Sequence, residues 1–296
     1  MSVETLPPLP SYGDGVRVVV PAPSAGPGNW AGAASAVLVD GTFWLTYRVR
    51  RPLSAGRGVT VVVARSADGV VFEPVAEVHR AAFGCESFER PVLVPVPGIG
   101  WRLYLSCATP GSKHWWVDSL TASTPEGLPD GERRVVLPGD EQVAVKDPVV
   151  ESTADGWRMW LCCHPLTDAG QEDRMTTRLL TSPDGLRWED HGEVLAGRAG
   201  RWDARGARVT TVLTQQPLAV LYDGRPDAAS NWYETTGVAR WDGIRLVADD
   251  EDPIASPFSD GAWRYASAVP LPDGRTRFYV EAARPDGAHD LVTVVV

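Results

Sequence analysis

The chain has 296 residues, with 28 Lys or Arg against 38 Asp or Glu, which gives a net charge of −10 at pH 7. Nucleic acids and anionic membrane surfaces favour basic faces, so the acidic balance argues against both as partners. No apolar run approaches the roughly 20 residues that a membrane-spanning helix needs. The N-terminus lacks a basic region followed by an apolar core, so we expect no secretory signal and a cytoplasmic protein.

The composition favours a β protein without a metal or a cofactor. The 12 Trp, 29 Gly and 25 Pro, with few long helical windows, are typical of a compact fold rich in turns. Buried thiols are expected for the four cysteines rather than a disulfide, because the adjacent Cys162 and Cys163 point to opposite faces of a predicted strand. No His or carboxylate cluster has the spacing of metal ligands, although an ion in a central channel stays open.

An internal repeat decides the predicted architecture. Units open near residues 30, 89, 146, 203 and 264, about 57 to 61 residues apart. Each unit reads as an apolar strand, a Gly-containing turn, a Trp- or Tyr-rich strand, a loop, and a third and a short fourth strand. Five four-stranded antiparallel units predict an all-β, five-bladed β-propeller. The predicted blades are residues 28–80, 85–138, 143–196, 201–250 and 256–296.

The ends of the chain are expected to complete this ring. The last unit shows only three strands, and the N-terminal strand 16–20 can supply the fourth, so residues 1–296 form one domain. The Ser-x-Asp-Gly turns at Ser66 and Ser182 predict hairpins whose following aromatics, Phe72 and Trp188, pack between blades. An open two-sheet sandwich is the alternative.

The first strand of each blade lines the centre of a propeller, so its polar residues are site candidates. In chain order they are Trp30, Glu89, Arg90, Lys146, Asp147, Asp203, Arg205 and Arg264. Charges inside strands are unfavourable unless they are paired or used. A second ring is expected from the ends of second strands and the starts of third strands, namely Arg48, His114, Asp118, His164, Asp223, Glu234 and Glu281.

Carboxylates, arginines and tryptophans together are typical of carbohydrate chemistry. Glycoside cleavage needs two carboxyl groups, one protonated and one ionised, and aromatic faces stack on sugar rings. Glu234 stands out because it breaks a predicted aromatic strand. Glu281 is either a site residue or the partner of an inner arginine. Arg90, Asp147 and Arg205 can alternatively pair across blades as structural ion pairs.

Four short motifs resemble those of five-bladed propeller glycoside hydrolases. They are Glu89-Arg-Pro, Lys146-Asp-Pro-Val-Val, the Ser182-Pro-Asp-Gly turn and Trp232-Tyr-Glu-Thr-Thr-Gly. The chain is similar in organisation to the arabinanase, xylosidase and fructosidase clans and the mannosyl-phosphorylase group. That resemblance implies a base in the first blade, a middle Asp that tunes the acid, and a later Glu as acid. Asp147 matches the middle Asp and Glu234 the acid.

The first blade departs from this pattern, since the strand from Trp30 carries no acidic residue. Glu89, Asp203 or another residue is then the base. The leading hypothesis is a glycoside hydrolase-like enzyme that acts on a small or exo-exposed sugar with Glu234, Asp147, Glu89 and Asp203 as catalytic candidates. The expected substrate contacts are Trp30, Arg48, Arg90, Trp116, Asp118, Lys146, His164, Arg205, Arg264 and Glu281. The alternatives are a sugar-binding protein and a biosynthetic enzyme for a non-sugar molecule. The sequence does not predict the oligomeric state.

Overall fold

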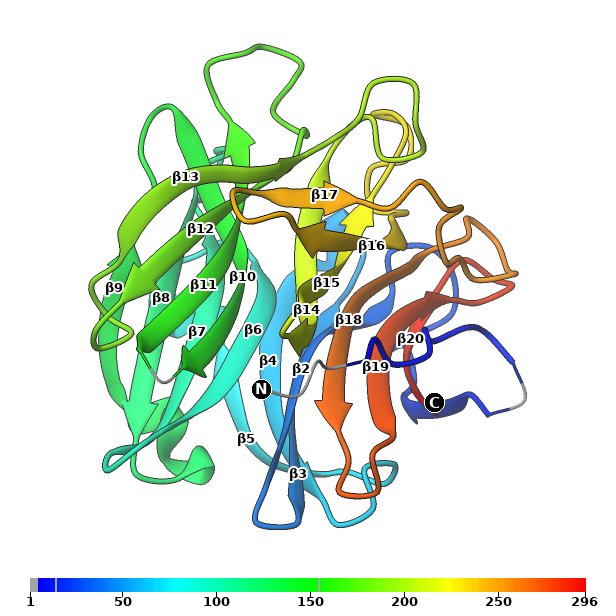
Figure 1. The fold of residues 1–296 in the computed structure, drawn as a ribbon. Coiled ribbons are helices and arrows are strands. Elements are labelled where there is room, and N and C mark those ends of the chain that lie inside the picture. The colour runs from blue at the N-terminus through cyan, green and yellow to red at the C-terminus, as the bar shows by residue number, and fades with distance from the viewer. Residues whose placement is uncertain (1–4, 14, 154) are drawn as a thin grey trace.

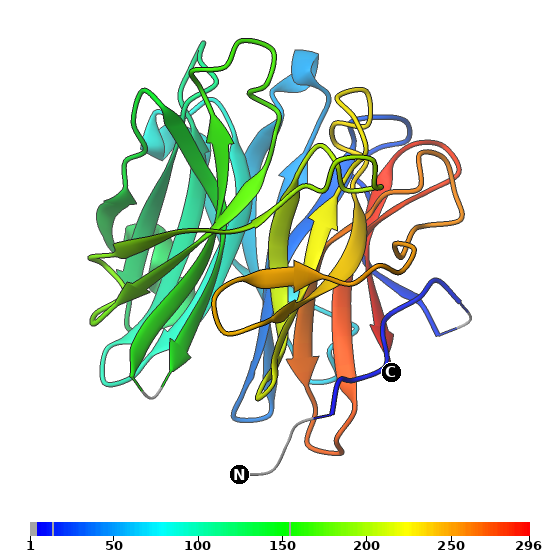
Figure 2. The same ribbon diagram turned by 45° about the horizontal axis from the view of Figure 1, so that its top comes forward.

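The computed structural model describes residues 5–13, 15–153 and 155–296 as an all-β protein (Figures 1 and 2). Three separate four-stranded sheets are antiparallel and follow the chain order of their strands. They are β6 (Phe88–Val96), β7 (Gly100–Ala108), β8 (Trp115–Ala122) and β9 (Glu132–Leu137); β10 (Val143–Thr153), β11 (Gly156–Pro165), β12 (Thr176–Ser182) and β13 (Glu189–Ala196); and β14 (Ala207–Gln215), β15 (Leu218–Gly224), β16 (Thr235–Trp241) and β17 (Leu246–Ala248).

The remaining strands form one larger sheet that joins the two ends of the chain. One half is β2 (Trp30–Val39), β3 (Thr42–Arg50), β4 (Gly58–Ser66) and β5 (Glu73–His79), and the other is β18 (Trp263–Pro270), β19 (Thr276–Ala283), β20 (His289–Val295) and β1 (Arg17–Val20). A single parallel pair, Trp30 with His289, links the halves. Strand β1 is antiparallel to β20, as expected for the N-terminal strand. The predicted all-β fold of four-stranded antiparallel sheets is confirmed.

The first strands of the sheets enclose the centre of the molecule (Figure 1). Strand β2 contacts β6, β6 contacts β10, β10 contacts β14, β14 contacts β18, and β18 contacts β2 again. Three short 3-10 helices, η1 (Leu53–Ala55), η2 (Arg80–Phe83) and η3 (Pro125–Asp130), lie in connections outside this ring. No helix in the described part of the chain is long and apolar enough to cross a membrane.

Apolar side chains fill the spaces between neighbouring sheets. Val92 and Tyr104 of one sheet pack with Val150 and Met159 of the next, and comparable clusters separate the other sheets. A buried aliphatic side chain contributes about 1.5 to 3 kcal/mol, so these layers provide most of the cohesion. The four cysteines are buried and free, as predicted.

The two Ser-x-Asp-Gly turns fasten one sheet to the next. Ser182 Oγ accepts from the backbone N–H of Gly185, whose carbonyl accepts from Tyr104 Oη at 2.7 Å. The turn after β4 repeats this arrangement, with Tyr279 Oη donating to the Gly69 carbonyl at 2.9 Å. The predicted scaffold role of these turns is confirmed.

Each first strand carries a register shift near its start. The shifts fall between Gly32 and Ser35, Phe88 and Pro91, Lys146 and Val149, Val209 and Thr211, and Arg264 and Ser267. Such β-bulges bend a strand and redirect its side chains. Ala33, Asp147 and Tyr265 occupy corresponding places in three of the bulges, and each has a left-handed backbone with φ of 52°, 49° and 53°. The bulges therefore set which side chains reach the centre.

Candidate functional site

A cluster of buried charged residues lies where the first strands begin. We call it the central cluster. Its acidic members are Glu89, Asp147, Asp223, Glu234 and Glu281, and its basic members are Arg48, Arg50, Arg90, Lys146, Arg208, Arg225 and Arg264. A charge is stable in such a place only when it has partners, so the pairing within the cluster defines what it can do.

The hydroxyl of Tyr265 joins two of the carboxylates. It lies 3.4 Å from Glu89 Oε2 and 3.2 Å from Asp147 Oδ2, and it accepts from Arg208 Nη1 at 2.9 Å. A hydroxyl has one proton, so it can donate to one carboxylate at a time. Burial raises the pKa of Tyr265, which keeps the hydroxyl protonated. Tyr265 is thus a neutral bridge between two acidic side chains.

Arg208 connects this bridge to a third acid, Asp223. Its guanidinium donates to Asp147 at 3.0 Å and to Asp223 at 2.8 Å. Burial alone would raise the pKa of Asp147, but the charges of Lys146 and Arg208 outweigh burial and hold this pKa below its usual range. Asp147 is therefore ionised. Burial raises the pKa of Asp223 in spite of Arg208.

Glu234 lies between two arginines, in the loop before β16. Arg225 Nη1 donates to one of its oxygens at 2.6 Å and Arg264 Nη1 to the other at 2.5 Å. Burial favours the neutral acid, but Arg264, Arg208 and Arg225 together hold the pKa of Glu234 well below its usual range. A general acid needs a proton to give, and this environment favours the ionised form of Glu234. The residues around Glu234 are a loop rather than the predicted aromatic strand.

Glu281 is held in a similar way on the opposite side. Arg264 donates to it at 2.7 Å, Arg48 donates at 3.2 Å, and its Oε1 lies 3.0 Å from His289 Nδ1. Arg48 also forms an ion pair with Glu89. Burial raises the pKa of Glu281, yet Arg264 and the hydrogen bond from His289 bring it below its usual value. This matches the pairing alternative raised for Glu281 from the sequence.

Lys146 is the one lysine among the basic members of the central cluster. Its Nζ lies 3.5 Å from Asp147 Oδ2 and 4.9 Å from the ring centroid of Trp115. Burial lowers the pKa of Lys146, and the charge of Asp147 opposes this only in part. A lysine with a lowered pKa can act in proton transfer, which an arginine cannot do.

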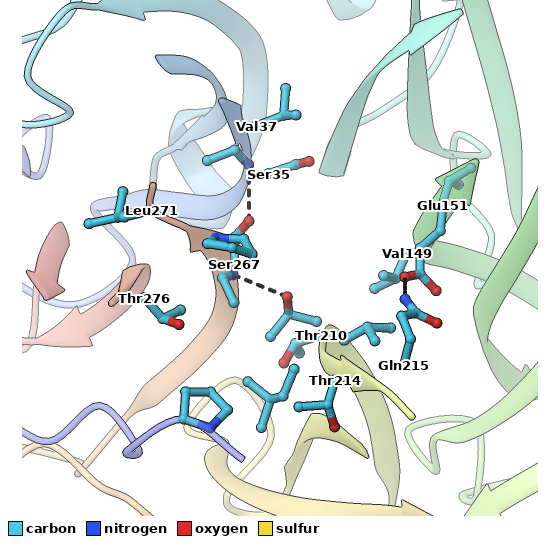
Figure 3. Close-up of a pocket in the computed structure, with 18 of the residues that line it drawn as sticks. Ser35, Val37, Val149, Glu151, Thr210, Thr214, Gln215, Ser267, Leu271 and Thr276 are labelled. Atoms are coloured by element: carbon cyan, nitrogen blue, oxygen red, sulfur yellow. Dashed lines mark hydrogen bonds between the residues drawn. The ribbon is translucent and has the colours of Figure 1, made fainter. Parts of the chain in front are cut away.

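Arg90 forms the floor of the central cluster. Its backbone N–H donates to Asp147 Oδ1 at 3.1 Å, and its Nη2 donates to the carbonyls of Ala34 at 3.0 Å and Ala266 at 3.4 Å. It therefore spans the ring from β6 to β2 and β18. Beyond it the later halves of the first strands line a cavity of about 850 Å³. Hydroxyl groups of Ser35, Thr210 and Ser267 belong to this lining (Figure 3).

Several predicted site residues belong to the central cluster or its edge. They are Trp30, Arg48, Glu89, Arg90, Lys146, Asp147, Glu234, Arg264 and Glu281. His164 lies at the edge, with its Nε2 3.6 Å from Cys162 Sγ. No group of three or more His, Cys, Asp or Glu side chains in the described residues has the arrangement of a metal site.

Four predicted residues lie elsewhere. Strand β14 begins at Ala207, so Asp203 and Arg205 are in the preceding turn, and Arg208 is the residue of this repeat that reaches the centre. Asp203 accepts from Tyr222 Oη at 2.8 Å, and Arg205 pairs with Asp173 at 2.6 Å. Trp116 donates to Asp118 of β8, and Asp118 pairs with Arg133 of the neighbouring strand β9.

The structure also brings in residues that the sequence did not single out, namely Arg50, Arg208, Arg225, Tyr265 and His289. Arg208 had a usable signal, because a charged residue before the apolar run of β14 repeats the pattern of Lys146-Asp147. Tyr265 follows Arg264 and occupies the bulge position of Asp147. Only the register of β18 reveals that equivalence.

Comparison with known proteins gives a likeness of fold. No protein-family model matches the sequence, and no curated protein does. Among solved structures, a glycosyl hydrolase from Bacteroides ovatus is 12% identical with a TM-score of 0.63, covering 99% of this chain and 94% of that one. The β-1,2-mannobiose phosphorylase from Listeria innocua is 14% identical, with a TM-score of 0.59 and coverage of 97% and 92%. The α-L-arabinofuranosidase from Lactobacillus brevis is 11% identical, with a TM-score of 0.64 and coverage of 89% and 90%.

The chain has the fold of these carbohydrate-active proteins. The resemblance predicted from the sequence motifs is thereby confirmed at the level of the fold, and the low identities mark a divergent relative in structure.

Proposed function

We propose that the chain is a single five-bladed β-propeller over residues 1–296, closed by β1, and that the central cluster is a carbohydrate-active site. The closed contacts of the first strands support the blade number. The proposed reaction is glycoside cleavage on a small or exo-exposed sugar. Proteins with a similar fold include a glycosyl hydrolase, a β-1,2-mannobiose phosphorylase and an α-L-arabinofuranosidase. Their names support this reaction class.

The observation that carries the proposal is the approach of Glu89 and Asp147. Both carboxylates contact the same hydroxyl, at 3.4 and 3.2 Å, so their nearest oxygens are no further apart than the sum of these distances. Carboxyl pairs that flank a glycosidic bond are about 5 to 9.5 Å apart. Two neighbouring first strands thus bring two carboxylates to one hydroxyl, and this closeness supports a site for glycoside cleavage.

The proposed roles follow from burial and charge. The side chain of Glu89 is 7% exposed, whereas that of Asp147 is fully buried. Glu89 is therefore the carboxylate that meets the sugar, as base or nucleophile. Asp147 orients it through Tyr265 and stays ionised. Lys146 supplies the proton to the leaving group, because burial lowers its pKa.

The test is turnover of a panel of nitrophenyl glycosides by the wild type and by Glu89→Gln, with and without inorganic phosphate. We expect turnover by the wild type and its loss in Glu89→Gln, with phosphate dependence separating a phosphorylase from a hydrolase. Circular dichroism establishes that the variant is folded. Equal turnover by the two proteins would refute the assignment of Glu89.

A second candidate is a propeller that binds sugar without cleaving it. Ala33 holds the bulge position in β2 that Asp147 holds in β10, so β2 adds no carboxylate to the centre. Asp147, Glu234 and Glu281 are all held ionised. Calorimetric binding of a sugar that is recovered unchanged would favour this function.

A further inference from the structure

Arg50 is a buried cation without an acidic partner. It ends β3, and its side chain lies between two indoles, with the guanidinium carbon 4.0 Å from the ring centroid of Trp30 and 5.2 Å from that of Trp232. Its Nη1 donates to the carbonyl of Gly28 at 3.3 Å. Within residues 5–13, 15–153 and 155–296, no carboxylate lies within ion-pair distance of Arg50.

The surroundings of Arg50 disfavour its charge. Burial lowers the pKa of Arg50 to about 9, repulsion from Arg48 and Arg264 adds to the effect, and the charge of Glu281, beyond ion-pair distance, opposes it only in part. A buried charge without a counter-ion is unstable. Arg102 provides the contrast, because it is equally buried and faces Trp157 but donates to Thr121 Oγ1 at 3.1 Å and the Asp184 carbonyl at 2.8 Å. Arg102 thus has two neutral hydrogen-bond acceptors, whereas Arg50 has one, the Gly28 carbonyl.

The central cluster as a whole is short of negative charge. It contains the seven basic and five acidic side chains named above, with Asp173 pairing with Arg225 from outside the cluster, although the chain carries a net charge of −10. A basic site inside an acidic protein attracts and retains small anions, because buried charges are screened weakly. The missing negative charge is thus expected to come from the ligand.

The stacking of Arg50 leaves its hydrogen-bonding edge available. Contacts with the indoles use the flat faces of the guanidinium, while the N–H groups lie in its plane and match the two oxygens of a carboxylate. Trp232 is 37% exposed and borders Arg50, so an aromatic surface for a sugar ring adjoins the cation. A single ligand that carries a sugar ring and a carboxylate would contact both Trp232 and Arg50.

We propose that the ligand of the central cluster is an acidic sugar of the uronate class, whose carboxylate pairs with Arg50 and whose ring contacts Trp232. This inference rests on the proposed function and specifies its substrate. Phosphate and sulfate groups share the anionic chemistry and also match the fork of arginine, so a sugar phosphate is included in the test.

The test is isothermal titration calorimetry of the full chain with galacturonate, glucuronate, galactose, glucose and glucose 6-phosphate. We expect a uronate to bind at least 10-fold more tightly than its neutral counterpart. Arg50→Met is expected to weaken the uronate about 10- to 100-fold, the effect of losing a charged hydrogen bond, and to weaken the neutral sugar much less. Arg102→Met serves as the matched control and should preserve the preference.

The outcomes separate the inference from the proposed function. Equal affinities for acidic and neutral sugars, or an equal loss of both in Arg50→Met, would overturn the acidic-sugar assignment and leave a carbohydrate site. If glucose 6-phosphate bound more tightly than the uronates and Arg50→Met lost that binding, the assignment of a carboxylate ligand would be overturned. No binding or turnover of any sugar would refute the proposed function itself. Arg50→Lys, which keeps the charge without the fork, replaces Arg50→Met if the latter does not fold.

Discussion

The hydroxyl of Tyr265 lies 3.2 Å from Asp147 Oδ2, although the two residues are 118 positions apart in the chain. Both have a left-handed backbone at the register shift of a first strand, with φ of 53° and 49°. That conformation is strained for residues with a Cβ and persists only where surrounding contacts hold it. Arg208 donates to both side chains, so the ion network and the strained backbone depend on each other.

Asp147 is expected to be essential for stability as well as for turnover. Asp147→Asn keeps the shape and tolerates a positive φ, but it removes the charge that Arg208 and Lys146 share. We expect the free energy of unfolding in urea to fall by about 3 to 5 kcal/mol. The free energy of unfolding of Asp147→Ala should fall further, because alanine at this positive φ adds backbone strain. Asp118→Asn, which breaks an outer pair, is the control and should keep turnover.

The sequence was informative about Asp147 because a charge inside an apolar strand is visible without a structure. The alternation of apolar and polar residues and the turn residues also predicted the sheets and the N-terminal strand, because these patterns depend only on residues close together in the chain. The position of β14 was less predictable. Trp202-Asp203 resembled a strand opening, yet the strand begins at Ala207, and Arg208 takes the central place.

The partners of the central residues could not be predicted for a physical reason. Glu234 is ionised because Arg225 and Arg264 reach it from the ends of two other strands, and no local pattern encodes that approach. Tyr265 reads as an ordinary aromatic strand residue. Its role depends on a bulge in β18, which shifts the register of its side chain.

Glu234 is expected to act through its two arginines. Glu234→Gln keeps the size of the side chain but leaves Arg225 and Arg264 without its charge. We expect a lower melting temperature and a raised KM, with part of kcat retained. If Glu234 itself donated the proton, Glu234→Gln would instead lose kcat and keep the melting temperature of the wild type. Steady-state kinetics and differential scanning calorimetry on the same samples distinguish these results.

Lys146 offers a sharper test of proton transfer. Lys146→Arg keeps a positive charge beside Asp147, but a guanidinium holds its proton far more firmly than an ammonium and does not release it near neutral pH. We expect sugar affinity in calorimetry to stay within a few-fold of the wild type and turnover to fall about 100- to 10000-fold. Full turnover by Lys146→Arg would remove Lys146 from the reaction.

Gly32 leaves the space that Glu281 occupies. A Cβ at Gly32 would lie 2.6 Å from Glu281 Cβ, which is too close for two carbon atoms. Glu281 is held by Arg264, so it cannot move aside freely. We expect Gly32→Ala to destabilise the protein by about 1 to 3 kcal/mol. Gly13→Ala, where no atom lies within 4 Å of the added carbon, should be near neutral in the same urea titration.

His164 is expected to control how stability responds to mild acid. Burial lowers the pKa of His164 from 6.5 to about 3, with repulsion from Lys146 adding to the effect. Between these pH values the unfolded chain binds a proton that the folded chain does not, so stability falls as the pH is lowered from 6.5. The slope is at most about 1.4 kcal/mol per pH unit.

His164→Asn removes this titrating group and keeps a side chain able to donate to the Glu172 carbonyl, which lies 3.1 Å from His164 Nδ1. Urea unfolding at a series of pH values should then show a flatter decline for the variant between pH 6.5 and 4. Below about pH 4 both proteins should lose stability together, because Asp147 and Glu234 have lowered pKa values and protonate first in the unfolded chain. Parallel curves from pH 7 to 4 would show that His164 is not the group responsible.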